Sequence, residues 1–457
     1  REANSPYHKA THPLPNVKPK PRFVDFRHSV VRLVVRDGVA LTAASNPHND
    51  IYTLSLRFGV GHEARPELVR LGEYLPKVGT DGLGADGFTR ALYELATTLS
   101  MEATAEEFVV TLEGPEENLA AALALLAQLM VDPATDRRRL RIVRREAWAT
   151  ERIYRSQPQQ VADALWEHVL YGQNSASRRR GMRALRTFGA DTLLRAWEDV
   201  QQRAVNVHYV GRRNPGEVSN LLRTLMPWPQ THAGAELPVE RLRLDYEGNQ
   251  VFFVPKRNTV QTQLWFYIQG DPIPPSLAAK RDAYEEYVAG SMGGVIFQEI
   301  REYRALAYSA YGGYREPSVA NRPGFFYGYV GCQADKTAES IDVMTSIISD
   351  MPRKPERMVS LRGALARSQE TADPDFRELP QAITEWRWQG YGTDPRRLRL
   401  REYDKLTWND VETFWREHVK DRTVVLMVVG DPKRIDMDIL RRHGPVTTIR
   451  EGTLYTP

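Results

Sequence analysis

Arg301 and Tyr308 have the residue types and the spacing to do chemistry on a carbonyl group. They stand seven positions apart in "FQEIREYRALAYSAYGGY" (297–314). A guanidinium group and a phenol are hydrogen-bond donors, and both can stabilise a developing oxyanion without a metal of their own. Taken alone, this spacing also fits a surface arginine beside a core tyrosine, so the elements around the pair must decide between the two interpretations.

The pair is predicted to lie where a helix runs into a strand. Residue patterns predict a helix over 282–302, strands over 306–315 and 324–333, and a helix over 336–351. An earlier block has a predicted hairpin, 100–114, between helices predicted over 84–99 and 115–130. Strands that pair locally and alternate with helices indicate an α+β fold, with an antiparallel or mixed sheet packed by helices.

The chain also repeats itself. The strand-like segments 51–61 and 260–270 both end in a glycine, and the segments 203–211 and 422–430 share Arg-x-Val at the start and Val-Gly at the end. These offsets predict a duplicated domain of roughly 210–220 residues. The expected division is a Pro-rich tail over 1–24, a first domain over 25–235, a linker over 236–250 and a second domain over 251–457.

Composition excludes several functional classes. With 42% apolar and 26% charged residues in a chain of 457, we expect a globular protein of two or more domains. The net charge of +4 is small and no basic stripe interleaves with aromatic residues, so nucleic-acid binding is not expected. No apolar run has the ~18 residues of a membrane helix. Cys332 is the single cysteine, so no intrachain disulfide can form.

Other catalytic motifs are absent or lack their context in the sequence. There is no His-Glu-x-x-His, no His-x-x-Glu-His and no Gly-x-Ser-x-Gly. His8 and His12 have the spacing of a metal pair but stand in the Pro-rich tail, where no helix is expected to bring them together. "GLGADG" (82–87) matches the dinucleotide fingerprint, yet no strand core precedes it, so it is predicted to be a flexible loop.

At "VRLGEYLPKVGT" (69–80) the chain resembles the pitrilysin/insulinase family of zinc peptidases. That family carries an inverted zinc motif, His-x-x-Glu-His, ahead of a Gly-Thr. Here Arg70, Glu73 and Tyr74 stand at the motif positions, so the glutamate is kept and both imidazoles are lost. The resemblance places the third zinc ligand near Glu146 or Glu151. We therefore expect no metal and no cofactor in this chain.

The resemblance extends to Arg301 and Tyr308. "IREYRALAY" (300–308) is similar to a second signature of the family, Leu-Arg-x-x-x-x-Leu-Gly-Tyr, and departs from it at Ile300 and Ala307. In the family, the arginine bonds the substrate backbone and the tyrosine stabilises the charge on the attacked carbonyl. Both act on a zinc site in the homologous half. The chain most resembles the carboxy-terminal half of long bacterial members, whose two halves are joined by a hinge.

The resemblance thus implies a metal-free half of a zinc metalloendopeptidase, inactive alone, acting with a zinc-bearing partner half on unfolded peptides. It also implies a place in the bacterial cell envelope, in the periplasm. Because the sequence begins at Arg1 without an initiator Met, we expect a piece of a longer protein. The alternative is a non-proteolytic structural member of the same family, comparable to core subunits of respiratory complexes.

Overall fold

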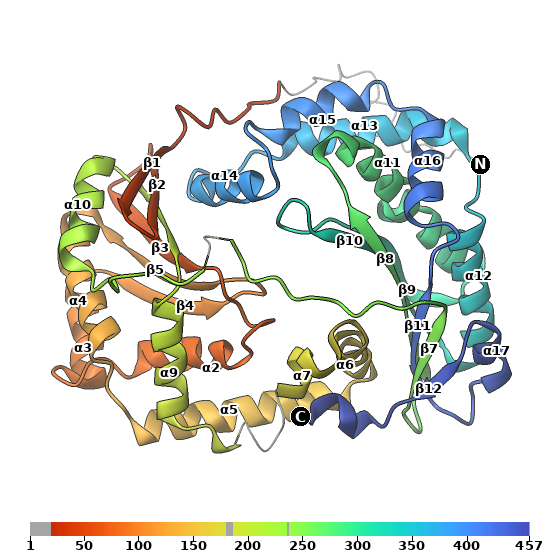
Figure 1. Ribbon diagram of the computed structural model, residues 1–457, viewed down its shortest axis with the longest axis horizontal. Helices are drawn as coiled ribbons and strands as arrows, with labels where there is room; N and C mark the ends of the chain where they lie inside the picture. Colours follow the sequence, from red (N-terminus) through yellow and green to blue (C-terminus); the bar gives the residue numbers. More distant parts are fainter. Residues whose placement is uncertain (1–19, 180–185, 235–236, 457) are drawn as a thin grey trace, which may run out of the picture.

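The computed structural model describes residues 20–179, 186–234 and 237–456. Most of the expected tail 1–24, with His8 and His12, lies outside these residues. Two halves follow one another along the chain, and in Figure 1 their sheets stand on the left and on the right. The first half ends at residue 234. An extended segment, 237–249, leads from it to the first strand of the second half.

The elements alternate between strands and helices in both halves. The first half contains β1 (Val31–Arg36), β2 (Val39–Ser45), β3 (Ile51–Phe58), α2 (Glu67–Tyr74), α3 (Gly84–Glu94), β4 (Thr98–Ala103), β5 (Phe108–Pro115), α4 (Leu119–Val131), α5 (Arg137–Ser156), α6 (Pro158–Tyr171), α7 (Ala176–Arg179), α9 (Ala190–Gln201), β6 (Val205–Gly211) and α10 (Pro215–Leu225). The second half contains β7 (Gln250–Pro255), β8 (Gln261–Pro272), α11 (Ala278–Ala289), β9 (Ala307–Arg315), β10 (Pro323–Gln333), α12 (Thr337–Ser349), α13 (Met358–Thr371), α14 (Leu379–Trp388), α15 (Pro395–Tyr403), α16 (Trp408–His418), β11 (Val425–Gly430), α17 (Met437–Arg442) and β12 (Val446–Thr448).

The two sheets have the same topology over five strands. Within the described residues their orders are β1-β2-β6-β3-β5-β4 and β12-β7-β11-β8-β10-β9. β2 and β6 are parallel, as are β7 and β11, whereas the pairs from there to the β4 and β9 edges are antiparallel. Only the sixth strands differ, because β1 forms a hairpin with β2 while β12 returns parallel to β7. The predicted α+β fold with two duplicated domains is confirmed.

The pairing register of the strands corrects one detail of the repeat predicted from the sequence. Leu56 and Phe266 each pair with the residue four positions before the final glycine of the neighbouring strand. Gly61 lies five residues beyond Leu56, so its equivalent is Asp271 rather than Gly270. The repeat seen in the sequence was therefore one residue out at this strand, because β8 continues to Pro272 whereas β3 ends at Phe58.

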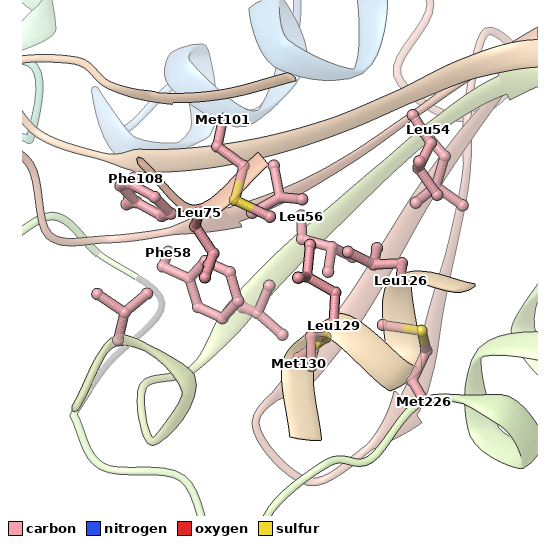
Figure 2. Packing of buried hydrophobic residues seen from close by; sticks show 14 of the residues in the cluster. Leu54, Leu56, Phe58, Leu75, Met101, Phe108, Leu126, Leu129, Met130 and Met226 are labelled. Carbon is pink, nitrogen blue, oxygen red and sulfur yellow. The ribbon is translucent and has the colours of Figure 1, made fainter. Parts of the chain in front are cut away.

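Alternation along the central strands builds the core of each half. In β3 every second residue is buried, which is the pattern of a strand with one face in a core. Leu54, Leu56 and Phe58 point from this strand toward α4, where Leu126 and Leu129 meet them (Figure 2). This close packing holds the first sheet and its helices as one layer on another.

Helix α6 leaves the sheet of its own half and packs on the other one. Its residues Val161, Leu165 and Val169 lie in one apolar cluster with Met427 and Val429 of β11. The apolar stripe of α6 is therefore covered by the second sheet, although α6 belongs to the first half of the sequence.

Helix α14 makes the reciprocal exchange. It lies beside β2 of the first half in Figure 1 and also contacts β6, and Ile383 packs there against Ala44 and Val210. Thr384 also stands 3.1 Å, Oγ1 to Nε2, from His208 on β6. Because α6 and α14 follow equivalent helices in their halves, the exchange obeys the pseudo-twofold relation of the duplication.

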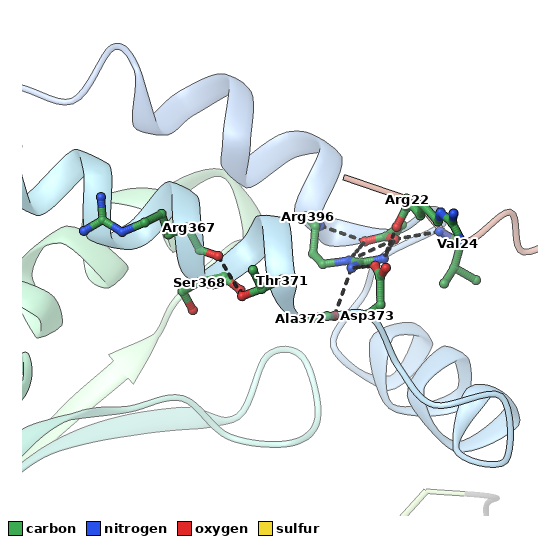
Figure 3. Close-up of polar contacts among 9 residues, drawn as sticks. Arg22, Val24, Arg367, Ser368, Thr371, Ala372, Asp373 and Arg396 are labelled. Atoms are coloured by element: carbon green, nitrogen blue, oxygen red, sulfur yellow. Dashed lines mark hydrogen bonds and ion pairs between the residues drawn. The ribbon is translucent and has the colours of Figure 1, made fainter. Parts of the chain in front are cut away.

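A buried ion pair ties the start of the described chain to α15. Asp394 and Arg396 are 0% and 3% exposed in their side chains and lie 2.7 Å apart, Oδ2 to Nη2. Asp394 also accepts hydrogen bonds from the backbone N–H groups of Val24 and Arg396, and Arg396 donates to the carbonyl of Arg22 (Figure 3). A second carboxylate, Asp373, pairs with Arg396 from a half-exposed position.

Two expectations for local structure were wrong. The helix predicted over 282–302 is broken, because α11 ends at Ala289 and the glycine-rich residues 290–294 separate it from a π-helical turn, Phe297–Glu302. The loop predicted over 82–87 is in part the first turn of α3, which begins at Gly84 with a φ of +63°. A short 3-10 turn, Leu75–Lys77, precedes these glycines where a dinucleotide fold would have a strand.

Candidate functional site

At the positions that resemble the zinc motif, Arg70 and Glu73 neutralise each other on α2. Nη1 of Arg70 lies 2.6 and 2.7 Å from the two carboxylate oxygens of Glu73. The residues are one turn apart on the same helix face, where opposite charges attract. The glutamate that remains of the motif is therefore held by its own helix neighbour rather than free to activate a water.

Tyr74 has become part of the core. Its side chain is fully buried, and its hydroxyl oxygen accepts a hydrogen bond from the backbone N–H of Asp136, 3.0 Å away. Burial raises the pKa of the Tyr74 phenol. Asp136 is the N-cap of α5, so Tyr74 positions the start of that helix.

The glutamates expected at the third ligand position do not complete a metal site. Glu146 is exposed on α5, whereas Glu151 is buried and pairs with Arg155 at 2.8 Å. In the part of the chain that the structure describes, no three His, Cys, Asp or Glu side chains are grouped as a metal site requires. The residues at the motif positions do not fit zinc, which prefers imidazole, thiolate and free carboxylate ligands.

We expect the purified chain to bind no zinc stoichiometrically, and Arg70→His/Tyr74→His to create no tight site. The second substitution would place an imidazole in the core instead of a phenol, and the loss of the hydrogen bond to Asp136 should cost about 1–3 kcal/mol of stability. Metal analysis after dialysis and a thermal melt of both proteins are the measurements. One tightly held zinc per molecule in the parent chain would show that the motif is not degenerate.

Arg301 and Tyr308 lie beside each other in the structure. The guanidinium carbon of Arg301 lies 5.1 Å from the ring centroid of Tyr308 and 4.8 Å from that of Phe297. The Tyr308 side chain is 80% exposed, and that of Arg301 is 39% exposed. The one ion pair of Arg301 among the described residues is a long, exposed contact of 3.8 Å with Glu302. Both donors are thus available to a ligand.

The backbone between the two residues is irregular in three places. Arg301 lies in the π-helical turn, and Ala305 has a left-handed φ of +49°. Ala307 and Ser309 of β9 pair with consecutive residues of β10, so Tyr308 is the extra residue of a bulge. π-turns, strained φ angles and bulges cost stability and are concentrated at functional sites, where they redirect side chains. Here they place Tyr308 outward beside Arg301.

Arg304 contrasts with Arg301 although it lies on the next turn. Its Nη1 donates to the carboxylate of Glu299 at 2.5 Å and to the Glu299 carbonyl at 2.9 Å. Lys354 pairs with the same carboxylate at 3.2 Å. The guanidinium group of Arg304 is therefore used in local hydrogen bonds, whereas that of Arg301 mainly contacts aromatic rings.

The sequence did not predict a cavity and a cleft that the structure contains. A cavity of about 440 Å³ adjoins β9, with walls from Trp166 of α6, Trp265 of β8 and Tyr311 of β9, and with Glu285 of α11 in its lining. A cleft of about 740 Å³ opens next to it between the halves. Both depend on the exchange of α6, which no local pattern indicates. The aromatic spacing of β8 to β10 was the only available signal.

A protein-family comparison supports the resemblance. Residues 202–356 match the family described as "Peptidase M16 inactive domain", and this range includes Arg301 and Tyr308 but not the degenerate motif. No curated protein sequence matches the chain.

Solved structures with the same fold cover most of the chain. The peptidase M16 inactive domain from Pseudomonas fluorescens is 16% identical, with a TM-score of 0.69, and the alignment covers 88% of this chain and 98% of that one. The periplasmic protease PqqL from Escherichia coli is 13% identical, with a TM-score of 0.71 over 92% of this chain and 47% of PqqL. A chain of complex III2 from Candida albicans is 14% identical, with a TM-score of 0.62 and coverages of 91% and 100%.

The family match and the fold confirm the resemblance to the pitrilysin/insulinase family, in the form of its inactive domains. The chain spans about half the length of the protease PqqL, whereas it spans nearly all of the Pseudomonas protein. Among the residues described, no helix combines the length and the apolar character needed to cross a membrane. Residues 202–356 thus match a family of inactive peptidase domains, and the fold of the whole chain is that of the M16 structures.

Proposed function

We propose that this chain is the metal-free half of a zinc metalloendopeptidase and supplies Arg301 and Tyr308 to the active site of a zinc-bearing homologous half. The observation that carries the proposal is the exposed contact between these two side chains on irregular backbone. At the same time the residues of the zinc motif are engaged in structural contacts. One half thus keeps donors for a transition state and has lost the means to hold a metal.

The two residues would act on the peptide bond from this side of the complex. Arg301 carries a permanent charge, and its fork of N–H donors suits the carbonyl oxygens of an extended peptide. The Tyr308 hydroxyl has no hydrogen-bond partner among the described residues, so it can donate to the oxyanion that forms on the attacked carbonyl. The zinc ion of the partner half would supply the activated water. Stacking on Tyr308 limits the motion of Arg301 before substrate arrives.

Reconstitution tests the proposal directly. This chain alone and the zinc-bearing partner half alone should each leave an unfolded peptide uncleaved. A mixture of the two should cleave it. We propose the periplasm as the compartment, on the precedent of PqqL. Full activity of the zinc-bearing half in the absence of this chain would contradict the assignment.

A structural role is the second candidate. It is favoured by the similarity to a chain of complex III2 and by the loss of the zinc motif. In that case the chain would bind homologous partners without contributing to turnover. The two candidates separate when Arg301 and Tyr308 are substituted in the assembled complex, since a scaffold needs neither side chain for catalysis.

A further inference from the structure

The aromatic cavity beside β9 has the features of a binding site for a cation. It lies at the β9 edge of the second sheet, where its lining comes from α6 on one face of the sheet and from α11 on the face that carries the main core of that half. The ring centroid of Trp265 is 4.9 Å from that of Trp166 and 5.9 Å from that of Tyr311, with Tyr311 nearly perpendicular to it. The faces of aromatic rings attract cations, and the attraction is stronger where water is excluded.

Glu285 brings a carboxylate to this cavity from α11. Gly313 of β9 has no side chain here, and a Cβ atom at that position would come within 3.1 Å of Oε1 of Glu285. No cationic group among the described residues lies within ion-pair distance of the Glu285 carboxylate. Burial raises its pKa, and its charge contributes to the raised pKa of Tyr327 across the cavity. A partly buried carboxylate without a counterion favours a ligand that supplies one.

Most of the other charges near the cavity are already paired with one another. Arg281 is buried and pairs with Asp282 at 2.5 Å and with Glu316. Arg399 approaches the same two carboxylates, at 3.6 and 4.0 Å. Two arginines thus face two carboxylates, which leaves Glu285 and Arg315 without an ion pair, although the charge of Arg281 also acts on Glu285 to lower its pKa. Arg315 lies at the exposed rim of the cavity without an ion-pair partner among the residues described.

The neighbouring cleft is acidic in a chain that is basic as a whole. It shares Trp166, Arg315, Glu316 and Phe325 with the cavity, and its lining carries eight carboxylates and five guanidinium groups. The whole sequence has a formal net charge of +4. This concentration of negative charge between the halves would attract cationic chains toward the cavity.

We propose that the cavity binds the side chain of a lysine or arginine in a peptide, with Glu285 as its counterion and Trp265 and Tyr311 against its stem. The proposal rests on the proposed function only for the assumption that the ligand is a peptide. It assigns a substrate class, peptides with an exposed basic residue, to a place that is independent of Arg301 and Tyr308.

Equilibrium binding to this chain alone tests the proposal without any turnover. The probes are the blocked peptides acetyl-Ala-Ala-Lys-Ala-Ala-amide and the same peptide with norleucine or glutamate at the centre, followed by calorimetry or tryptophan fluorescence. The lysine peptide should bind at least about tenfold more tightly than the norleucine peptide, because a desolvated ion pair and cation–π contact are added to the same stem. Equal binding of the two, or tightest binding of the glutamate peptide at Arg315, would overturn it.

Matched variants distinguish the binding role of the Glu285 carboxylate from a general effect on folding. Glu285→Gln should abolish the preference for lysine over norleucine, whereas Glu286→Gln should keep it. Glu286 is the next residue on α11, has a pKa that burial likewise raises, and does not line the cavity. Tyr311→Leu, at a half-exposed position, is the second test should Glu285→Gln fail to fold, and it should weaken binding of the lysine peptide roughly three- to tenfold. Retention of the full lysine preference by Glu285→Gln, or of the full affinity for the lysine peptide by Tyr311→Leu, would refute the site, and would leave the reconstitution experiment untouched.

Discussion

Tyr308→Phe should lower kcat of the assembled peptidase by about 10²–10³-fold, because one preorganised donor to the oxyanion is lost. The substitution removes only a hydroxyl that has no hydrogen-bond partner among the described residues, and the side chain is 80% exposed. Folding and assembly should therefore be unchanged. The measurements are steady-state kinetics of the reconstituted complex and a thermal melt of the variant chain. An effect confined to KM would indicate that Tyr308 binds the ground state only.

Arg301→Ala should reduce kcat/KM with a part of the loss in KM, since the guanidinium group also holds the substrate backbone. Arg304→Ala is the matched control, because it removes the same charge from the following turn, where Arg304 pairs with Glu299. If Arg304→Ala is as damaging to turnover as Arg301→Ala, general positive charge matters and the assignment of Arg301 is wrong. If neither variant affects turnover, the structural role is the better description of the chain.

Asp394→Ala should destabilise the chain by about 3–5 kcal/mol, because it leaves the buried charge of Arg396 without its fully buried partner. The same change removes the acceptor for the backbone N–H of Val24 and the cap of α15. Denaturant unfolding measures the loss, and faster proteolysis near residue 24 should accompany it.

Asp373→Ala is the control for this ion pair. Asp373 contacts the same guanidinium group at 2.7 Å, but its side chain is 48% exposed, so its removal should cost no more than about 1 kcal/mol. Equal losses for the two variants would show that burial does not distinguish the two carboxylates.

The elements that the sequence predicts well are those whose signal is local. Gly211 and Gly430 end the two parallel ladders at equivalent places. Their equivalence could be predicted because each strand and the glycine that ends it lie within one short segment of sequence. Arg301 and Tyr308 meet because a helical turn followed by a strand start brings residues seven positions apart close together. The outward direction of Tyr308 could not be predicted, since it depends on a bulge that forms only against β10.

The exchange of α6 and α14 and the aromatic cavity were beyond sequence reasoning for a different reason. The apolar stripe of α6 is the same whichever sheet covers it, so periodicity predicts a packed helix and not its partner. Four residues that line the cavity come from four elements, of which one belongs to the first half and three to the second. The residues concerned are Trp166 of the first half and Trp265, Glu285 and Tyr311 of the second. At the degenerate motif the sequence predicted the loss of zinc ligands, but not that Tyr74 supports the N-cap of α5.

The exchanged helices also determine how a peptide could enter. To widen the cleft between the sheets, α6 would have to detach from β11 and α14 from β2 and β6, and two buried apolar clusters would meet water at once. Such a movement costs far more than the swing of a tethered domain. We therefore expect this chain to move as one rigid body. In the proposed complex, entry and release of peptides would then depend on the angle between this chain and the zinc-bearing half. A cross-link between the two sheets within this chain should leave that opening unaffected.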